Sequence, residues 1–312
     1  MTNERQGTLI GVDVGGTKIE GVLTDGSGAV LATHRVPARP GDAQVVGDIV
    51  AVCRRLSDAP LPVGIGIPGQ VDSERGVVRD IVNLGIVRLD LAEEVGAALA
   101  EEVGAALGAP VRVENDVNAA ALGAAAIVGE PVPAGQDFVF LNFGTGLAAG
   151  VVRDGRVAHG ASGAIGEIGH IPVDPNGLPC PCGQHGCLET VASGGAVARL
   201  WPQGEPPMPD LLAKAAAGDA EAGRVLGMVV HAIGDTVQIV IQAYDPAVIA
   251  IGGGMAKTGR PLIDAIAAEL DRRAAASHFL RTLDMPGRLR LLPADEPIGA
   301  IGAALAAKVL AR

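Results

Sequence analysis

The chain of 312 residues is 48% hydrophobic, contains 45 glycines but only 4 Phe, 1 Trp and 1 Tyr, and carries a formal net charge of −11. This length suits about two domains, and the apolar content excludes an intrinsically disordered chain. The acidic charge argues against a protein that binds a nucleic-acid backbone, and the scarcity of aromatic residues argues against one that stacks on bases.

Apolar runs that end at turn residues predict strands, and apolar residues at helical spacing predict helices. In the first half of the chain they predict strands at 8–14, 19–24, 29–36, 62–67 and 111–113 and helices at 43–56, 89–107 and 117–128. The second half repeats this order, with strands at 138–143, 148–152, 156–159, 247–251 and 289–292 and helices at 209–217, 220–244, 262–276 and 298–310. We therefore expect two similar α/β domains with a cleft between them, at 1–116 and 117–297, and a last helix, 298–312, that can return to the first.

The apolar segment from Val225 to Ile241 is interrupted by His231, Asp235 and Gln238. We expect it to form a buried helix and not a membrane span, because a span needs a longer apolar run without charges. The first residues lack the basic and then apolar order of a secretion signal. These features predict a cytoplasmic protein that binds neither a membrane nor a nucleic acid.

Residues 91–98 and 99–106 are identical copies of the octapeptide Leu-Ala-Glu-Glu-Val-Gly-Ala-Ala. Eight added residues lengthen a helix by about 12 Å and rotate its face by about 80°. We expect a longer surface helix without a function of its own, with an interface as the alternative.

Two glycine turns between predicted strands are candidate phosphate-binding loops. Glycine lets a backbone turn approach phosphate oxygens with its N–H groups as donors, while an aspartate suits a water-bound Mg²⁺ and a lysine adds positive charge. A glycine-rich hairpin without a ligand is the alternative for either turn alone, but the repetition favours a bound polyphosphate. The first turn contributes Asp13, Gly15, Gly16, Thr17 and Lys18, and the second contributes Gly144, Thr145 and Gly146.

A third glycine turn, Gly252-Gly253-Gly254, follows the predicted strand at 247–251. Backbone without side chains lets a ribose or a flat ring lie against it. A tight connection from strand to helix is the alternative.

The segment Glu114-Asn115-Asp116 lies where a predicted strand meets a predicted helix. Asp116 suits two roles there. It can cap the helix that follows, or it can act as the general base that deprotonates a hydroxyl group during phosphoryl transfer.

One histidine and three cysteines lie close together in a segment too rich in Gly and Pro for a regular helix: His170, Cys180, Cys182 and Cys187. An imidazole and three thiolates complete the tetrahedral ligand set of structural zinc, which leaves no open position for catalysis. Glu167 and Glu189 flank these ligands, and their carboxylates can accept hydrogen bonds from the hydroxyl groups of a sugar.

Together these motifs resemble the ROK family (repressors, open reading frames and kinases) of the sugar kinase, hexokinase and actin-like ATPase superfamily. The resemblance covers nearly the whole chain, and the segment from Gly166 to Glu189 is its most diagnostic part. It implies a two-lobed α/β protein with the actin-like ATPase or hexokinase fold, a structural zinc-binding segment, and assembly into a homodimer or homotetramer.

By this resemblance, Asp116 is the catalytic base, and the sugar contacts are Gly69, Asn83, Asn115, Asp116, Glu167, His170 and Glu189. The two glycine turns would bind the phosphates of ATP together with a catalytic Mg²⁺, and 252–254 would bind the adenosine. His170 would hold zinc through one ring nitrogen and face the sugar with the other.

The implied activity is that of an ATP-dependent hexokinase, most simply a glucokinase that forms the sugar 6-phosphate. Kinases of N-acetylmannosamine, N-acetylglucosamine or fructose are the alternatives within the family, and a non-catalytic sugar sensor is the alternative from another class. Glu167 favours glucose, because N-acetylmannosamine kinases of the family tend to carry another residue there. Ile86 departs from the tryptophan that many glucokinases of the family carry at this position.

Overall fold

The computed structural model describes residues 7–103 and 110–311, which form two compact units. The first unit contains the described residues up to Gly129 together with 155–163 and 296–311, and the second contains 130–154 and 164–295. The sequence predicts a division after residue 116, whereas the contacts divide the chain after Gly129. The reason is that helix α3 (Asp116–Val128) packs along α10 (Ile298–Ala307) inside the first unit.

A five-stranded sheet in the order β3-β2-β1-β4-β8 forms the base of the first unit. Its first three strands pair as antiparallel hairpins, and β4 and β8 then add in parallel to β1. Because β1, β4 and β8 are parallel, their carboxyl ends lie along one edge, which is where open α/β sheets bind ligands. The strands are β1 (Leu9–Val14), β2 (Lys18–Thr24), β3 (Val30–Pro37), β4 (Val63–Ile67) and β8 (Val111–Asn115).

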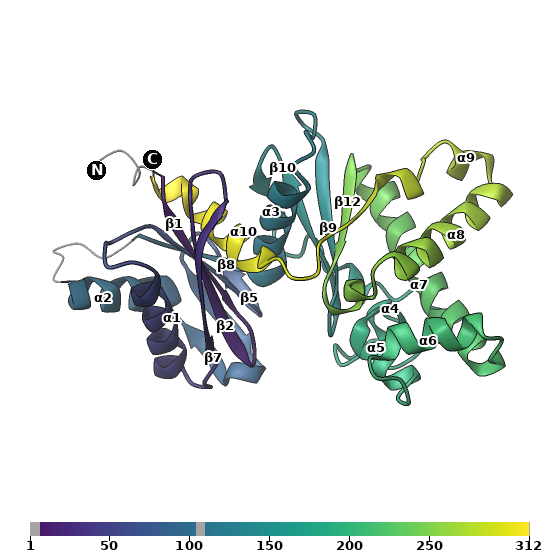
Figure 1. The fold of residues 1–312 in the computed structure, drawn as a ribbon, viewed down its shortest axis with the longest axis horizontal. Helices are drawn as coiled ribbons and strands as arrows, with labels where there is room; N and C mark the ends of the chain where they lie inside the picture. The colour runs from purple at the N-terminus through teal and green to yellow at the C-terminus, as the bar shows by residue number, and fades with distance from the viewer. Residues whose placement is uncertain (1–6, 104–109, 312) are drawn as a thin grey trace. The chain divides into compact units, whose positions relative to one another are not determined.

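Glycines allow α10 to pack directly on the backbone of this unit (Figure 1). A Cβ atom at Gly11 of β1 would lie 1.9 Å from the carbonyl oxygen of Ala300, and one at Gly64 of β4 would lie 1.7 Å from that of Ala303. No side chain fits at such distances, so these positions require glycine. The last helix therefore lies against β1, which carries Asp13, and against β4, and it also packs on α3, which begins at Asp116.

Helices α1 (Asp42–Leu56) and α2 (Leu91–Val103) complete the first unit and contribute Ile49 and Leu91 to its core. Leu91 and Leu99 are the first residues of the two octapeptide copies, and both are buried. The last three residues of the second copy, 104–106, lie outside the described residues.

A three-stranded antiparallel sheet between β4 and α2 was not predicted. It contains β5 (Gln70–Asp72), β6 (Val77–Ile81) and β7 (Ile86–Leu89), with the single turn η1 (Val82–Leu84) between the last two. Strands of three to five residues are too short for a clear alternation of apolar and polar residues, which explains why the sequence pattern does not show them.

The sheet of the second unit, in the order β11-β10-β9-β12-β13, repeats the arrangement of the first. An antiparallel hairpin of β9 and β10 is extended by the parallel strands β12 and β13. The predicted fold of two similar α/β halves is thus confirmed. The strands are β9 (Asp137–Phe143), β10 (Leu147–Arg153), β11 (Arg156–Val157), β12 (Val248–Gly252) and β13 (Leu289–Leu291).

The helices of the second unit include α7, which lies alongside α8 and the shorter α4 and α6. By length and composition α7 could cross a membrane, but 56% of its apolar window is buried within the protein, as in a core helix. The helices are α4 (Glu189–Ala192), α5 (Gly194–Leu200), α6 (Pro207–Ala216), α7 (Ala220–Tyr244), α8 (Arg260–Ala276) and α9 (His278–Arg281), with the short turns η2 (Ile168–His170), η3 (Gly254–Thr258) and η4 (Pro286–Arg288); η5 (Lys308–Ala311) ends the first unit.

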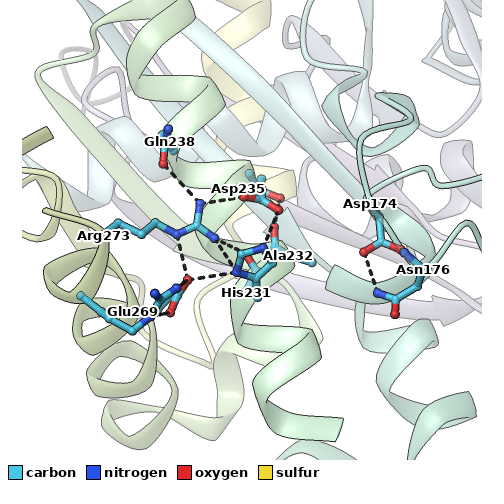
Figure 2. A network of polar contacts seen from close by, with 10 residues as sticks. Asp174, Asn176, His231, Ala232, Asp235, Gln238, Glu269 and Arg273 are labelled. Carbon is cyan, nitrogen blue, oxygen red and sulfur yellow. Dashed lines mark hydrogen bonds and ion pairs between the residues drawn. The ribbon is translucent and has the colours of Figure 1, made fainter. Parts of the chain in front are cut away.

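A network of polar contacts joins α7 to α8 (Figure 2). The guanidinium group of Arg273 donates to Asp235 at 2.7 Å, to Glu269 at 2.8 Å and to the backbone oxygen of His231 at 2.7 Å. A Cβ atom at Gly234 would lie 2.8 Å from Arg273 Nη2, so the guanidinium group rests against the bare backbone of α7. These contacts tie the two helices together through one side chain.

Candidate active site

The first glycine turn connects β1 to β2 at the edge of the parallel strands. The amide of Gly15 donates to the carbonyl oxygen of Lys18 at 2.9 Å, which closes the hairpin, and Gly16, Thr17 and Lys18 are exposed. Lys18 Nζ lies 3.1 Å from the carboxylate of buried Glu20. The sequence reasoning missed Glu20, although residues two apart on a strand share one face and the spacing from Lys18 signals the pair.

Asp13 lies near the end of β1, where its backbone is paired with Gly66 of β4, which in turn pairs with Glu114 of β8. Burial and the negative charges of Asp116 and Glu20 raise the pKa of Asp13 to about 7, while Lys18 acts in the opposite direction. A buried carboxylate beside two other negative charges is a position that a bound cation would stabilise.

Asn115, and not Asp116, caps helix α3. Its Oδ1 accepts from the amides of Val117 at 3.0 Å and Asn118 at 3.3 Å, as an N-cap side chain does. The interpretation of Asp116 as the cap is therefore wrong. Asp116 is the first residue of the helix, and its Oδ1 accepts from the amide of Val117 at 2.9 Å.

Two further predicted sugar contacts lie in the first unit. Gly69 has a φ of +94°, and a Cβ atom there would lie 2.7 Å from the carbonyl oxygen of Arg79, so glycine is required. Asn115 Nδ2 donates to the carbonyl oxygen of Gly69 at 3.4 Å. Asn83 is exposed on η1 beside Gly16 of the first turn, where a Cβ atom would lie 3.7 Å from its Nδ2.

The second glycine turn connects β9 to β10, and the first residues of α5 donate hydrogen bonds to its backbone. The amide of Gly194 donates to the carbonyl oxygen of Gly144 at 2.8 Å, and the amide of Gly195 donates to that of Thr145 at 3.2 Å. A side chain at Gly194 or Gly195 would collide with the turn, since a Cβ at Gly195 would lie 2.5 Å from the carbonyl oxygen of Thr145. These contacts from Gly194 and Gly195 were not predicted, although Ser-Gly-Gly before a helical pattern is the signal of a capped helix start.

Glu189 joins the second turn to the cysteine segment. Its Oε2 accepts from the amide of Leu147 at 3.1 Å, and its Oε1 lies 3.8 Å from Cys180 Sγ. A Cβ atom at Gly146 would lie 2.5 Å from Glu189 Oε2, so the carboxylate occupies the space that this glycine leaves open.

The third glycine turn packs against the end of β9. Gly252 pairs with Asn142 in the sheet, and Gly253 has a φ of +84°. A Cβ atom at Gly253 would lie 2.5 Å from Asn142 Oδ1, so the turn reaches the strand that leads into Gly144. Gly254 then begins η3 with open space around it.

The four predicted metal ligands form one cluster, with their ligand atoms all within 4.8 Å of one another: His170, Cys180, Cys182 and Cys187. Zn–S bonds of about 2.3 Å in tetrahedral geometry separate two sulfurs by about 3.8 Å. Cys182 Sγ and Cys187 Sγ are 3.7 Å apart, and Cys180 Sγ is 3.7 Å from His170 Nδ1. The four side chains therefore fit a tetrahedral zinc ion, with Nδ1 of the histidine directed to the metal.

Gln184 supports this cluster and was not predicted. Its side-chain amide donates to the carbonyl oxygen of His170 at 3.1 Å and to Cys182 Sγ at 3.5 Å. This second bond, together with the backbone N–H of Gln184 and the neighbouring thiols, lowers the pKa of Cys182 to about 6. A thiol of that pKa is largely a thiolate at neutral pH, which is the form that binds metal.

Two glycines, Gly166 and Gly169, let the backbone around Glu167 and His170 pack directly against β10. A Cβ atom at Gly166 would lie 1.8 Å from the carbonyl oxygen of Ala149, and one at Gly169 would lie 2.0 Å from that of Leu147. Glu167, between them, is exposed, and its Oε2 lies 3.9 Å from Nε2 of His170. The second nitrogen of His170 thus faces Glu167, on the side away from the cysteines.

The predicted site residues form one group in each unit. The first group contains Asp13, Gly15, Gly16, Thr17, Lys18, Gly69, Asn83, Asn115 and Asp116. The second contains Gly144, Thr145, Gly146, Glu167, His170, Cys180, Cys182, Cys187, Glu189, Gly252, Gly253 and Gly254.

Comparison with known proteins gives a consistent result. The family model described as "ROK family" matches residues 9–309. The chain is 32% identical over 284 residues to a glucokinase of Halalkalibacterium halodurans (82% of this chain and 83% of the relative), and 30% identical over 263 residues to an N-acetyl-D-glucosamine kinase of Aliivibrio salmonicida (78% and 83%). The crystal structure of a ROK family glucokinase from Streptomyces griseus in complex with glucose and AMPPNP is similar with a TM-score of 0.70 and 29% identity, over 96% of this chain and 98% of that one.

Proposed function

Because the chain belongs to the ROK family and is a sugar kinase that uses ATP, we propose that it is a glucokinase in which Asp116 is the general base. The sugar 6-hydroxyl would attack the γ-phosphorus of ATP, forming the new O–P bond while the bond to the β-phosphate oxygen breaks and ADP leaves. The proton of the hydroxyl passes to the Asp116 carboxylate.

One observation carries this assignment: the negative charge of Asp116 raises the pKa of Asp13 at the carboxyl ends of the parallel strands, and Asn115 caps α3 in place of Asp116. Two carboxylates at such an edge can divide their roles. Asp13 would hold Mg²⁺ through water, and Asp116 would orient the hydroxyl and take its proton.

The other site residues supply binding and orientation. The amides of the two glycine turns would donate to phosphate oxygens, and Gly252–Gly254 would leave room for the adenosine. The sugar hydroxyls would be bound by Gly69, Asn83, Asn115, Glu167, His170 and Glu189. Mg²⁺ would offset the charge of the phosphates when bound, and zinc would hold the segment that carries Glu167, His170 and Glu189.

The choice of glucose rests on its glucokinase relatives and on Glu167. The relative that acts on N-acetyl-D-glucosamine, at 30% identity, makes this sugar the second candidate. Residue 86 is isoleucine and not an aromatic residue, so binding of the sugar would depend on hydrogen bonds more than on stacking against a ring. We propose that the enzyme works in the cytoplasm as a dimer or tetramer.

Substitution of Asp116 by Asn tests the mechanism. We expect Asp116→Asn to lower kcat by at least about 10³-fold while glucose still binds, because the amide keeps the shape but accepts no proton. Asp42→Asn is the matched control, since Asp42 is likewise the first residue of a helix but is exposed on α1. Near-normal turnover by Asp116→Asn would remove Asp116 from the role of base.

A coupled ADP-release assay over glucose, mannose, fructose, N-acetylglucosamine and N-acetylmannosamine tests the substrate. We expect the highest kcat/KM with glucose. A clear preference for an acetylated sugar would overturn the choice of glucose and leave the kinase assignment intact. Sugar-dependent stabilisation without ADP release from any of these sugars would instead indicate a sensor.

A further inference from the structure

Glu114 is a buried carboxylate immediately before the proposed catalytic turn. Only 3% of its side chain is exposed, and Oε2 lies 2.8 Å from Nε2 of His159. His159 comes from the segment 155–163, which belongs to the same unit as Glu114. Its own side chain is 37% exposed.

The other oxygen of Glu114 reaches both sides of Asp116. Oε1 accepts from the amide of Asn115 at 3.0 Å and from Nδ2 of Asn118 at 3.3 Å. Asn115 in turn caps α3 and donates to Gly69, so one carboxylate anchors the residues before and after Asp116. A chain of hydrogen bonds thus runs from His159 through Glu114 to the residues on either side of Asp116.

Stability alone does not require this pair. A buried ion pair costs desolvation that its attraction repays only in part, and apolar residues of similar volume are often as stabilising. Burial by itself would raise the pKa of Glu114, but the hydrogen bond and charge of His159, together with the hydrogen bonds from Asn115 and Asn118, outweigh it and lower that pKa. The hydrogen bond to Glu114 raises the pKa of His159, with Glu74 acting in the same direction and Arg112 in the opposite one. A charged pair kept at this place points to a role in geometry.

We propose that His159 is a positioning residue of the kinase, which acts through Glu114 to fix the Asn115–Asp116 turn. This rests on the proposed role of Asp116 as base. A carboxylate displaced by about 1 Å from a reacting hydroxyl can cost about 100-fold in rate, so a restraint on the turn is worth keeping even if it adds nothing to stability.

The test compares His159→Leu, which removes the donor, with His159→Gln, which keeps a donor without the charge. We expect His159→Leu to lower kcat by about 10- to 100-fold, with the dissociation constant for glucose close to wild type. The thermal midpoint should fall as well, because Glu114 is left buried without its partner. His159→Gln should recover most of the lost kcat, because its amide can still donate to Glu114. His34→Leu is the matched control, a half-buried histidine of β3 in the same unit, and should leave kcat unchanged.

A second variant keeps the proposal falsifiable if His159→Leu folds poorly. Glu114→Gln, which keeps the shape of the acceptor, should lower kcat without changing glucose binding, and the double variant Glu114→Gln/His159→Leu should lose no more than the worse single variant. Additive losses in kcat, or a kcat that stays low in His159→Gln although its thermal midpoint recovers, would overturn the positioning role. If Asp116→Asn abolishes turnover while His159→Leu leaves kcat intact, only this proposal fails; if Asp116→Asn stays active, the proposed base fails first.

Discussion

The carboxylate of Glu189 accepts a hydrogen bond from the backbone amide of Leu147 at 3.1 Å and lies beside the thiol of Cys180. One side chain therefore contacts both the second glycine turn and the cluster of metal-binding residues. Because the turn is a proposed phosphate-binding loop, the order of the cysteine segment and the geometry of the turn are linked within the second unit.

Gly146→Ala tests this link at the point of closest approach. The new methyl group would lie 2.5 Å from Glu189 Oε2, so the carboxylate must move and the bond to Leu147 is lost. We expect the KM for ATP to rise by about tenfold, corresponding to roughly 1.4 kcal/mol of binding, while bound zinc is retained. Steady-state kinetics with varied ATP measure the effect.

Gly47→Ala is the control for that experiment. Gly47 lies within α1, where a Cβ atom would meet nothing within 4 Å. We expect unchanged kinetics and a free energy of unfolding higher by about 0.5–1 kcal/mol, because alanine restricts the unfolded chain. An unchanged KM for ATP in Gly146→Ala would contradict the coupling.

Removal of the metal should destabilise the segment between Gly166 and Glu189. We expect one zinc per chain by metal analysis and its loss in Cys182→Ser, because serine does not replace a thiolate ligand. The thermal midpoint should fall by roughly 5–10 °C. Cys53→Ser, at the buried cysteine of α1 outside the cluster, should retain one zinc per chain. Full zinc content in Cys182→Ser would show that this cysteine is not a ligand.

Local patterns in the sequence were sufficient to predict most of the fold. The glycine turns, the cysteine spacing and the strands of both sheets depend on residues close together in the chain, so hydrophobic periodicity and turn residues signal them. The three short strands from Gln70 to Leu89 lack a clear period, and the sequence does not show them.

Contacts between distant residues could not be predicted in the same way. Glu114 and His159 are 45 residues apart, and Glu189 and Leu147 are 42 apart, so only the folded backbone brings them together. The choice between Asn115 and Asp116 as the cap of α3 depended on where β8 ends, and helix boundaries are uncertain by one or two residues even in structures.

The raised pKa of Asp13 should make the stability of the protein depend on pH. Its pKa is about 7 in the folded protein against an ordinary value of 3.8, so the folded state holds this proton over a range where the unfolded state has released it. Folding stability contributed by this group therefore falls as pH rises from about 4 to about 7. Asparagine does not titrate, so its contribution does not change with pH. The free energy of unfolding of Asp13→Asn relative to the wild type should therefore be higher at pH 8 than at pH 5 by on the order of 2 kcal/mol. Urea unfolding of both proteins at the two pH values measures this gain, and an equal difference at both would contradict it.

Arg273, which Figure 2 shows between α7 and α8, should matter far more to stability than its neighbour Arg272, although both contact Glu269. The side chain of Arg273 is 10% exposed, whereas that of Arg272 is 65% exposed. Burial alone would raise the pKa of Glu269, but hydrogen bonds from both arginines lower it to about 2, so the carboxylate stays charged.

Arg273→Met would leave Glu269 and Asp235 without their shared partner between α7 and α8. We expect it to lower the free energy of unfolding by about 2 kcal/mol, because both carboxylates lose hydrogen bonds from a mostly buried guanidinium group and are left with Arg272 and His231 as partners. Arg272→Met should stay near the wild type, since water replaces an exposed partner. Urea unfolding at pH 7 measures both, and equal losses in the two variants would show that burial does not set the strength of this network.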